Sequence, residues 1–393
     1  MTIPIKALKQ TAALAKSLAK TGAISTTIDG IARYSGGPEL KHISLEYLLS
    51  RNVLPLGCII HIFGPEGCGK TTLALDLLNR YFIREGGNGD AIDTEGKISP
   101  PLYRAIIDPG AEQEKRFIVH RAMTQEATQG VVNALVKHIN SVTFGKNHDE
   151  FPHLEGIIID SFRVASEQTQ DKITAEGHAT KQFALEANLW RPFLATTSAK
   201  MLYAPISLIL VNHMTEKEAT YGKVKDHGGG LALKFYETYS ILLTKMNSHR
   251  TKTESYSDLT LQTYKNSNGP DRQKICPRIV YKSASEDGTP NTYVDWTIAD
   301  ARLLSGPDIP REALKRAGVC NVKESTKAGL YSDDVLGVSC VPIEGILEKI
   351  YSDPARIGRL RQELSIYTAK TLDELWEDGW FFDARSIVES DEE

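Results

Sequence analysis

The chain has 393 residues, which is too long for one small core, since domains usually run about 100 to 200 residues. With 41% hydrophobic and 24% charged residues, 30 Gly and 17 Pro, the composition excludes a collagenous or largely disordered protein. The formal net charge is −4, but residues 371–393 carry nine acids and one arginine, which leaves +4 for the rest. A basic body with an acidic tail suits a regulated polyanion binder, and the alternative is a tail that only aids solubility.

Targeting and redox signals point to the interior of the cell. The apolar stretches are strand-sized, and the N-terminal segment has neither the apolar run nor the cleavage site of a secretory signal. The five cysteines are scattered and form no C-x-x-C pair, which argues against a disulfide framework and a zinc site. We therefore expect a cytoplasmic protein that does not contact a membrane.

The first part of the chain predicts a short lysine-bearing helix and a turn-rich linker, which we expect to pack against another subunit. From Cys58 onward, short β-branched runs alternate with longer amphipathic segments, a pattern typical of a parallel α/β sheet. The expected strands are 58–63, 89–93, 116–120, 155–160 and 206–211. The expected helices are 70–83, 125–139 with Thr124 as N-cap, and 180–202.

Beyond Gly228 the pattern changes to β-rich segments without long helices between them, at 238–245, 259–264 and 278–282. These segments predict antiparallel strands that extend the sheet at one edge. After Pro307 the pattern is mostly helical, over 311–317, 343–351 and 355–365. We expect three parts: an N-terminal helix and linker (1–50), an α/β core (51–300), and a small, mostly helical domain with the acidic tail (301–393).

A phosphate-binding motif follows the first expected strand. The pattern G-x-x-x-x-G-K-[ST] stands between an apolar strand and a helix and consists of Gly64, Pro65, Glu66, Gly67, Cys68, Gly69, Lys70 and Thr71. The glycines let successive backbone N–H groups turn toward a phosphate, and the helix N-terminus adds a positive dipole end. Lys70 is expected to reach the β and γ phosphates, and the Thr71 hydroxyl to ligate Mg²⁺.

Two carboxylates at strand ends are candidates for the chemistry. Asp160 ends an apolar run, and a carboxylate in that place suits the magnesium shell. Many P-loop ATPases place a glutamate directly after this aspartate, but Ser161 stands here. Glu95, just beyond the strand that ends at Asp93, is the expected general base, because open α/β sheets collect their ligands at the carboxyl ends of the strands. Spacing alone leaves open a solvated acid on a loop.

The strand 206–211 leads into a polar and basic segment, 214–227, which is expected to form a loop. His213 stands where such sheets often place a side chain that senses the γ-phosphate, and the alternative is a structural hydrogen bond. Lysines around an aromatic ring on a glycine-hinged loop suit single-stranded DNA, with charge for phosphates and a ring for stacking on bases. A flexible surface loop is the alternative. The candidate DNA-binding residues are Lys217, Tyr221, Gly222, Lys223, Lys225, Gly229 and Gly230.

Together these segments resemble the RecA family of DNA strand-exchange recombinases, over roughly residues 43–281. The resemblance rests on GPEGCGKTTL (64–73), DTEGK (93–97), IIIDS (157–161), LVNH (210–213) and GGGLALKFY (228–236). The last is no general ATPase motif and is similar to the segment that ends the family's second DNA-binding loop. His213 occupies the position of a glutamine in bacterial RecA, and a histidine there resembles phage UvsX-type recombinases.

The resemblance implies roles for individual residues in the nucleotide site. Lys70, Thr71 and Thr72 are similar to the family's phosphate and magnesium contacts. Glu95 is similar to its catalytic glutamate, and Tyr103 to the aromatic residue that stacks on adenine.

The resemblance also bears on contacts outside that site. Lys265 resembles the first lysine of a Lys-Asn-Lys run that reaches the ATP of the neighbouring subunit, while Ser267 replaces the second lysine. The first DNA-binding loop, near residues 168–180, has no match beyond Glu176-Gly177.

The implied protein is an ATP- and Mg²⁺-dependent recombinase with a RecA-like P-loop ATPase core, in which a mostly parallel sheet is flanked by helices and bordered by antiparallel strands. It would form helical filaments on single-stranded DNA, pair them with homologous duplex DNA, and work with single-strand-binding and mediator proteins. We expect it in the bacterial cytosol, cellular or phage-encoded. Two alternatives stay open. A hexameric helicase or motor fits poorly with the short region before Gly64, and a mediator with little ATPase activity fits poorly with intact Lys70, Thr71, Asp160 and Glu95.

Overall fold

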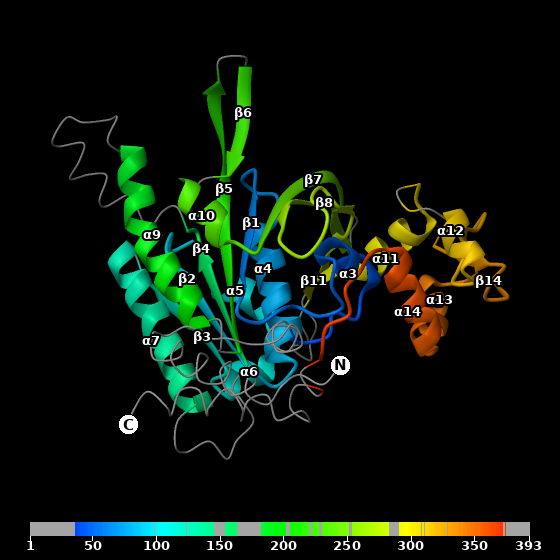
Figure 1. The fold of residues 1–393 in the computed structure, drawn as a ribbon, viewed down its shortest axis with the longest axis horizontal. Coiled ribbons are helices and arrows are strands. Elements are labelled where there is room, and N and C mark those ends of the chain that lie inside the picture. The colour runs from blue at the N-terminus through cyan, green and yellow to red at the C-terminus, as the bar shows by residue number, and fades with distance from the viewer. Residues whose placement is uncertain are drawn as a thin grey trace, which may run out of the picture.

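The computed structural model describes residues 36–97, 99–122, 124–144, 154–162, 182–201, 205–219, 222–227, 230–250, 254–282, 291–307, 309, 311–327, 329–371 and 374. These residues form a large sheet with helices on both faces and a smaller unit beside it (Figure 1). The expected N-terminal helix, the segment of the first DNA-binding loop and most of the acidic tail lie outside the described residues.

The described strands of the large sheet run mostly parallel. The parallel strands follow the order β7-β1-β5-β4-β2-β3, and their bounds are β1 (Ile59–Gly64), β2 (Asn88–Asp93), β3 (Phe117–Arg121), β4 (Glu155–Asp160), β5 (Ile206–Ala219) and β7 (Tyr239–Arg250). Beyond β7 the sheet continues with antiparallel strands, which are β8 (Glu254–Asn266), β10 (Arg278–Lys282) and β11 (Thr292–Asp295), and the short β9 (Lys274–Ile275) pairs with β8.

Helices cover the sheet on both faces because its strands are apolar on both faces. In β4, Ile158 packs into one hydrophobic cluster, while Ile157 and Ile159 pack into another on the opposite face. The first face is covered by α4 (Lys70–Leu78), which continues as a π-helical turn η1 (Asn79–Ile83), and by α5 (Pro100–Arg104) and α6 (Pro109–Gln113). The second face is covered by α7 (Gln125–Phe144), α9 (Gln182–Met201) and α10 (Gly230–Tyr236).

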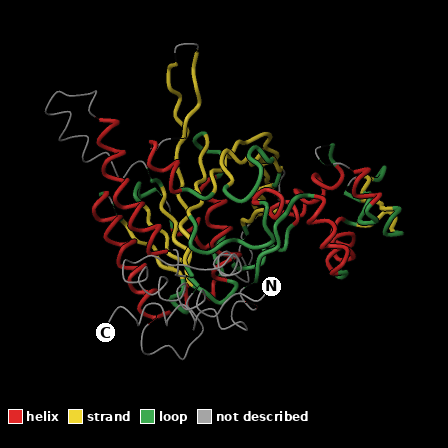
Figure 2. Tube along the Cα trace, in the orientation of Figure 1, coloured by secondary structure: helices red, strands yellow, loops and turns green. Residues whose placement is uncertain are grey.

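The α/β fold with antiparallel edge strands is confirmed, and Figure 2 shows the strands enclosed between helices. The segment 214–227 differs from its prediction as a loop. Strand β5 extends to Ala219 and pairs antiparallel with β6 (Gly222–His227), in a hairpin that projects from the end of the sheet in Figure 1. Pairing satisfies the backbone N–H and C=O groups of this long segment, which an extended loop would leave to water.

The unit after the sheet contains helices and a small sheet. Its helices are α11 (Trp296–Ser305), α12 (Arg311–Arg316), α13 (Ile343–Tyr351) and α14 (Pro354–Glu363). The antiparallel strands β12 (Val322–Glu324), β13 (Tyr331–Asp333) and β14 (Val338–Val341) were not predicted. Strands of three or four residues are too short to display the alternating pattern that identifies a strand.

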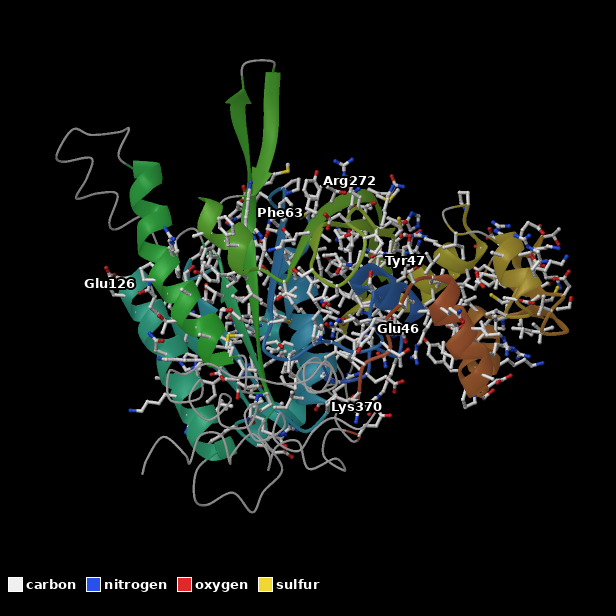
Figure 3. The ribbon with its side chains drawn as sticks, viewed as in Figure 1. Glu46, Tyr47, Phe63, Glu126, Arg272 and Lys370 are labelled. Carbon is white, nitrogen blue, oxygen red and sulfur yellow. The ribbon has the colours of Figure 1, made fainter. Side chains whose placement is uncertain are left out.

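Helix α3 (Ile43–Leu49) lies where the large sheet and this unit meet. Leu45 and Leu48 pack into the core of the sheet, whereas Ile43 packs into the core of the C-terminal unit. Glu46 is buried and accepts two hydrogen bonds from Arg361, at 2.7 and 2.9 Å. Figure 3 places Glu46 and Tyr47 between the two parts. No helix among the described residues has the length and apolar character needed to cross a membrane.

Candidate nucleotide-binding site

The loop between β1 and α4 forms a tight turn that requires glycine at two positions. Gly69 has φ of +102°, in the left-handed region, directly before the first residue of α4. A Cβ on Gly64 would lie 2.1 Å from the Leu243 carbonyl oxygen, so β7 leaves no room for a side chain. The loop therefore leads straight into a helix N-terminus, where unpaired backbone N–H groups favour an anion.

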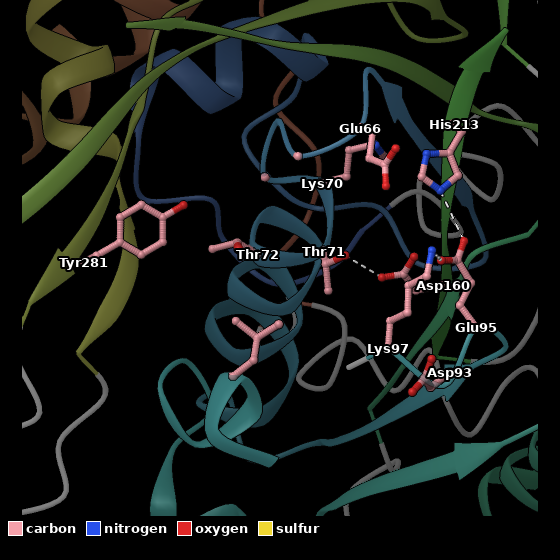
Figure 4. Close-up of a pocket in the computed structure, with 13 residues that line it drawn as sticks. Glu66, Lys70, Thr71, Thr72, Asp93, Glu95, Lys97, Asp160, His213 and Tyr281 are labelled. Atoms are coloured by element: carbon pink, nitrogen blue, oxygen red, sulfur yellow. Dashed lines mark hydrogen bonds and ion pairs between the residues drawn. The ribbon is translucent and has the colours of Figure 1, made fainter. Parts of the chain in front are cut away.

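This loop borders a cavity of about 340 Å³ at the carboxyl ends of the parallel strands (Figure 4). Its walls come from the β1–α4 loop, the ends of β2 and β4, strand β5, and β10 on the opposite side. The lining residues are Glu66, Gly67, Gly69, Lys70, Thr71, Thr72, Asp93, Glu95, Lys97, Leu102, Asp160, His213 and Tyr281. Most of the nucleotide-site residues predicted from sequence thus meet in one place.

Lys70 lies against the loop that precedes it. Its Nζ donates hydrogen bonds to the carbonyl oxygens of Gly64 at 3.1 Å and Pro65 at 2.7 Å, and the residue is only 6% exposed. The ammonium group is held by the first two residues of the phosphate-binding motif. A phosphate bound there would compete with these carbonyls for the ammonium, because a charge-assisted hydrogen bond is stronger than one to a neutral acceptor.

Thr71 and Asp160 form the candidate magnesium site. The Thr71 hydroxyl donates to Asp160 Oδ2 at 2.5 Å. Burial raises the pKa of Asp160, the hydrogen bond from Thr71 lowers it, and the net shift is upward. A bound cation would offset the free-energy cost of burying the charged Asp160 carboxylate. Hydroxyl and carboxylate oxygens are hard ligands, and Mg²⁺ is usually held by one or two carboxylates together with substrate phosphates and water, so these two residues fit the ion.

Glu95 lies beside two nitrogen donors. Lys97 Nζ is 2.7 Å from Glu95 Oε2, and His213 Nε2 is 3.2 Å from Oε1. Burial raises the pKa of Glu95, but the hydrogen bonds from Lys97 and His213 outweigh it, and the pKa is lowered. The carboxylate is therefore ionised at neutral pH, as a general base must be.

Hydrogen bonds between the ends of β2 and β4 bring Glu95 and Asp160 to the same side of the cavity. The Thr94 hydroxyl donates to the Ser161 carbonyl at 2.7 Å and accepts from the Ser161 N–H at 2.8 Å. The Thr94 N–H donates to the Asp160 carbonyl at 2.8 Å. The two strand ends are thus fixed relative to each other, and the carboxylates with them.

Tyr103 is not among the residues that line the cavity, and its expected stacking on adenine stays a prediction. Its side chain is 7% exposed, and its ring packs on Phe117 with centroids 5.3 Å apart. The preceding residue, Leu102, faces the cavity instead, since neighbouring helical residues point about 100° apart. Tyr281 of β10 lines the side of the cavity opposite Glu95 (Figure 4).

Sequence reasoning also missed Asp93, Lys97 and Tyr281 as cavity residues. Lys97 stands within the DTEGK segment, two residues from Glu95, and this spacing was the available signal. Tyr281 had no such signal, because only the pairing of β10 with β8 brings it to the site.

Lys265 lies away from the cavity. Its Nζ donates to the carbonyl oxygens of Lys234 at 2.6 Å and Phe235 at 3.5 Å, near the C-terminal end of α10. A cation is favourable at this end of a helix. The structure therefore does not bring Lys265 to the nucleotide site of its own chain.

The candidate DNA-binding residues are distributed along the β5–β6 hairpin. The register pairs Lys217 with Val224, Lys223 with Glu218, and Lys225 with Glu216. Gly222 begins β6 and Gly230 begins α10, while Tyr221 and Gly229 lie outside the described residues. Two of the lysines thus stand opposite acidic residues.

Comparison with known proteins agrees with this geometry. Curated relatives include the RecA proteins of Rubrobacter xylanophilus, 26% identical over 250 residues, and Fusobacterium nucleatum, 27% identical over 241 residues. The RecA protein of Clostridium novyi is 28% identical over 207 residues. The matches cover 63%, 61% and 52% of this chain and 67%, 58% and 53% of the relatives. The chain therefore spans about half to two thirds of the length of these relatives.

A mostly parallel sheet with a phosphate-type loop at its carboxyl edge and antiparallel strands beyond β7 defines a RecA-like α/β fold. The model of the RecA N-terminal domain matches residues 19–285, well over half of the chain. The chain belongs to the RecA family.

Proposed function

We propose that this protein is an ATP-dependent recombinase that assembles on single-stranded DNA and pairs it with a homologous duplex. The observation that carries the proposal is the path of strand β5. His213 of this strand contacts Glu95 in the cavity, and the same strand continues into the hairpin that contains Lys217. One continuous element links the candidate nucleotide site to the candidate DNA-binding surface, which supports coupling between ATP and DNA.

ATP with Mg²⁺ is the proposed ligand of the cavity. The N–H groups of the β1–α4 loop and Lys70 would hold the phosphates, with Thr72 nearby. Thr71 and Asp160 would hold Mg²⁺, which neutralises phosphate charge when bound. Tyr281 and Leu102, which line the cavity, would contact the nucleobase, and Tyr103 is the contact that the family resemblance implies.

In the proposed hydrolysis, Glu95 accepts a proton from the attacking water as the water adds to the γ-phosphorus and the bond to the β-phosphate oxygen breaks. Lys70 stabilises the negative charge on the phosphate oxygens. His213, 3.2 Å from Glu95 Oε1, orients the carboxylate and would sense the state of the γ-phosphate through it. A rearrangement at His213 would be passed along β5 to the hairpin.

Assembly into a filament would complete the site. Lys265 does not reach its own cavity, in keeping with a role at the ATP of a neighbouring subunit. Lys217, Lys223 and Lys225, with Tyr221, Gly222, Gly229 and Gly230, are the proposed DNA contacts. The histidine at position 213 supports a phage UvsX-type recombinase, and single-strand-binding and mediator proteins are the proposed partners.

Electron microscopy of the protein with single-stranded DNA and a non-hydrolysable ATP analogue tests this function. A recombinase gives helical filaments that depend on the analogue, and labelled homologous duplex is then taken up into joint molecules. Rings would favour a hexameric motor. Absence of any assembly, with negligible ATP turnover, would favour a mediator.

A further inference from the structure

Both oxygens of the Glu95 carboxylate have a donor at hydrogen-bond distance. His213 approaches Oε1 at 3.2 Å, and Lys97 approaches Oε2 at 2.7 Å. The shorter of the two contacts is a full ion pair. An ammonium ion this close stabilises the carboxylate as an anion and makes it a weaker acceptor of the proton from water.

The two partners of Glu95 are held very differently. His213 belongs to β5 and is paired with Gly64 of β1, while the pairing of β5 with β4 ends at Val211. Lys97 belongs to the segment after β2, and its side chain is 71% exposed. The backbone of His213 is therefore held by the sheet, whereas the contact from Lys97 depends on a long, solvated side chain that can form and break it.

We propose that Lys97 is a positioning residue that makes Glu95 a weaker base and so slows ATP hydrolysis; this inference rests on the proposed ATPase function. Under the proposed function the ATP-bound filament is the assembled state, so ATP would have to remain bound while DNA strands are paired. Slow hydrolysis then lengthens the lifetime of the filament. In this arrangement Lys97 acts on the proton-accepting step through Glu95 and leaves the affinity for ATP unchanged.

The test is Lys97→Gln, which removes the charge and keeps a side chain of similar length. We expect kcat for ATP hydrolysis on single-stranded DNA to rise about two- to fivefold, the range for loss of a solvent-exposed ion pair. KM for ATP stays unchanged, and filaments dissociate correspondingly faster after ATP is withdrawn. Lys97→Arg, which retains the ion pair, keeps the parent rate.

A matched pair elsewhere provides the control. Lys41 Nζ lies 3.1 Å from Glu85 Oε1, with side chains 61% and 31% exposed, and this pair is outside the cavity. Lys41→Gln should leave kcat unchanged. In a Glu95→Gln background, Lys97→Gln should add nothing to single-turnover rates, because its effect passes through the carboxylate.

The possible results separate this inference from the function on which it rests. If the parent protein binds DNA but does not hydrolyse ATP, both the proposed function and the role of Lys97 are overturned. If the parent protein hydrolyses ATP, and Lys97→Gln either lowers kcat or raises only KM, the proposed role of Lys97 alone is overturned. A lysine that contacts phosphate would give that result. An acceleration that persists in the Glu95→Gln background also overturns it.

Discussion

Lys70 and Glu95 lie in one cavity but would act on different groups, phosphate oxygens in one case and water in the other. Lys70→Ala should therefore abolish ATP turnover through loss of phosphate contacts. Glu95→Gln should lower turnover by about 10²-fold or more while ATP binding persists, so that filaments accumulate on DNA. ATP turnover and equilibrium binding of a fluorescent ATP analogue check both variants.

The control for these two changes is Glu85→Gln, at a residue outside the cavity that should retain the parent rate. If Glu95→Gln hydrolyses ATP as fast as the parent, the general base has been assigned to the wrong residue.

Tyr103 and Tyr281 should respond differently to truncation. Tyr103 is packed on Phe117 in the core, so Tyr103→Ala should destabilise the protein by about 3 kcal/mol, measured by denaturant unfolding. Tyr281→Ala should instead weaken ATP binding by roughly tenfold, if the ring stacks on the base, with a smaller loss of stability.

Tyr103→Phe sharpens this comparison. The Tyr103 hydroxyl is buried and has no hydrogen-bond partner among the described residues. Its removal should be neutral or stabilising, because an unsatisfied buried hydroxyl costs free energy. A large rise in the dissociation constant for ATP in Tyr103→Phe or Tyr103→Ala would return the nucleobase contact to Tyr103.

At the residue scale, the sequence could place Asp160 and Glu95 because each follows a strand, and the carboxyl ends of parallel strands share one edge of the sheet. Tyr281 could not be placed in this way. Its position depends on the pairing of β10 with the distant strand β8, and no local pattern encodes that pairing. Tyr103 and Leu102 differ by one helical position, which is finer than a pattern of spacing can resolve.

At the scale of elements, long apolar strands were predictable and the β5–β6 hairpin was not. The expected strand ended at Val211, where continuous apolar character stops, but β5 continues to Ala219 through charged residues. The sequence of this hairpin has no apolar alternation by which a strand could be recognised. Its register, with Lys223 opposite Glu218 and Lys225 opposite Glu216, became apparent only from the pairing.

This register makes Lys217 the most informative residue of the hairpin, since its cross-strand neighbour is Val224 rather than an acid. Lys217→Ala should reduce affinity for single-stranded DNA and lower the slope of log affinity against log salt by about 0.7, the value for one lost phosphate contact. Tyr221→Ala should reduce affinity by about 1 to 3 kcal/mol with a nearly unchanged slope, if its ring stacks on a base.

Fluorescence anisotropy with a labelled oligonucleotide at several salt concentrations measures both quantities. Lys349→Ala, in α13 of the C-terminal unit, is the control and should leave the slope as it is. Unchanged affinity in both hairpin variants would mean that the hairpin does not bind DNA.

At the scale of the whole molecule, we propose the division into residues 1–50, 51–300 and 301–393. The C-terminal unit has a core of its own, but α3 from the first part joins it to the sheet. Burial raises the pKa of Glu46, the hydrogen bond and charge of Arg361 lower it, and the net shift is upward. This buried pair links α3 to α14 of the C-terminal unit, and the charge pattern of the sequence alone could not reveal it.

Assembly of the molecule gives the last prediction, which concerns Lys265. Its Nζ bonds near the C-terminal end of α10 and not in its own cavity, so a role in hydrolysis requires a neighbouring subunit. Lys265→Ala should retain ATP binding and lose most DNA-dependent ATP turnover. Lys274→Ala on the adjacent β9 is the control and should keep the parent turnover. Loss of the contact at α10 could also disturb the hairpin, and DNA affinity measured in parallel detects that effect.

A mixing experiment tests the contribution in trans directly. A Lys265→Ala subunit keeps its own Glu95, and a Glu95→Gln subunit can supply Lys265 to a neighbour. Because helical filaments use one head-to-tail interface throughout, an equal mixture of the two weakly active variants should contain about a quarter of intact sites and recover that share of parent turnover. No recovery, in a mixture shown to form joint filaments, would mean that Lys265 acts only within its own chain, through α10.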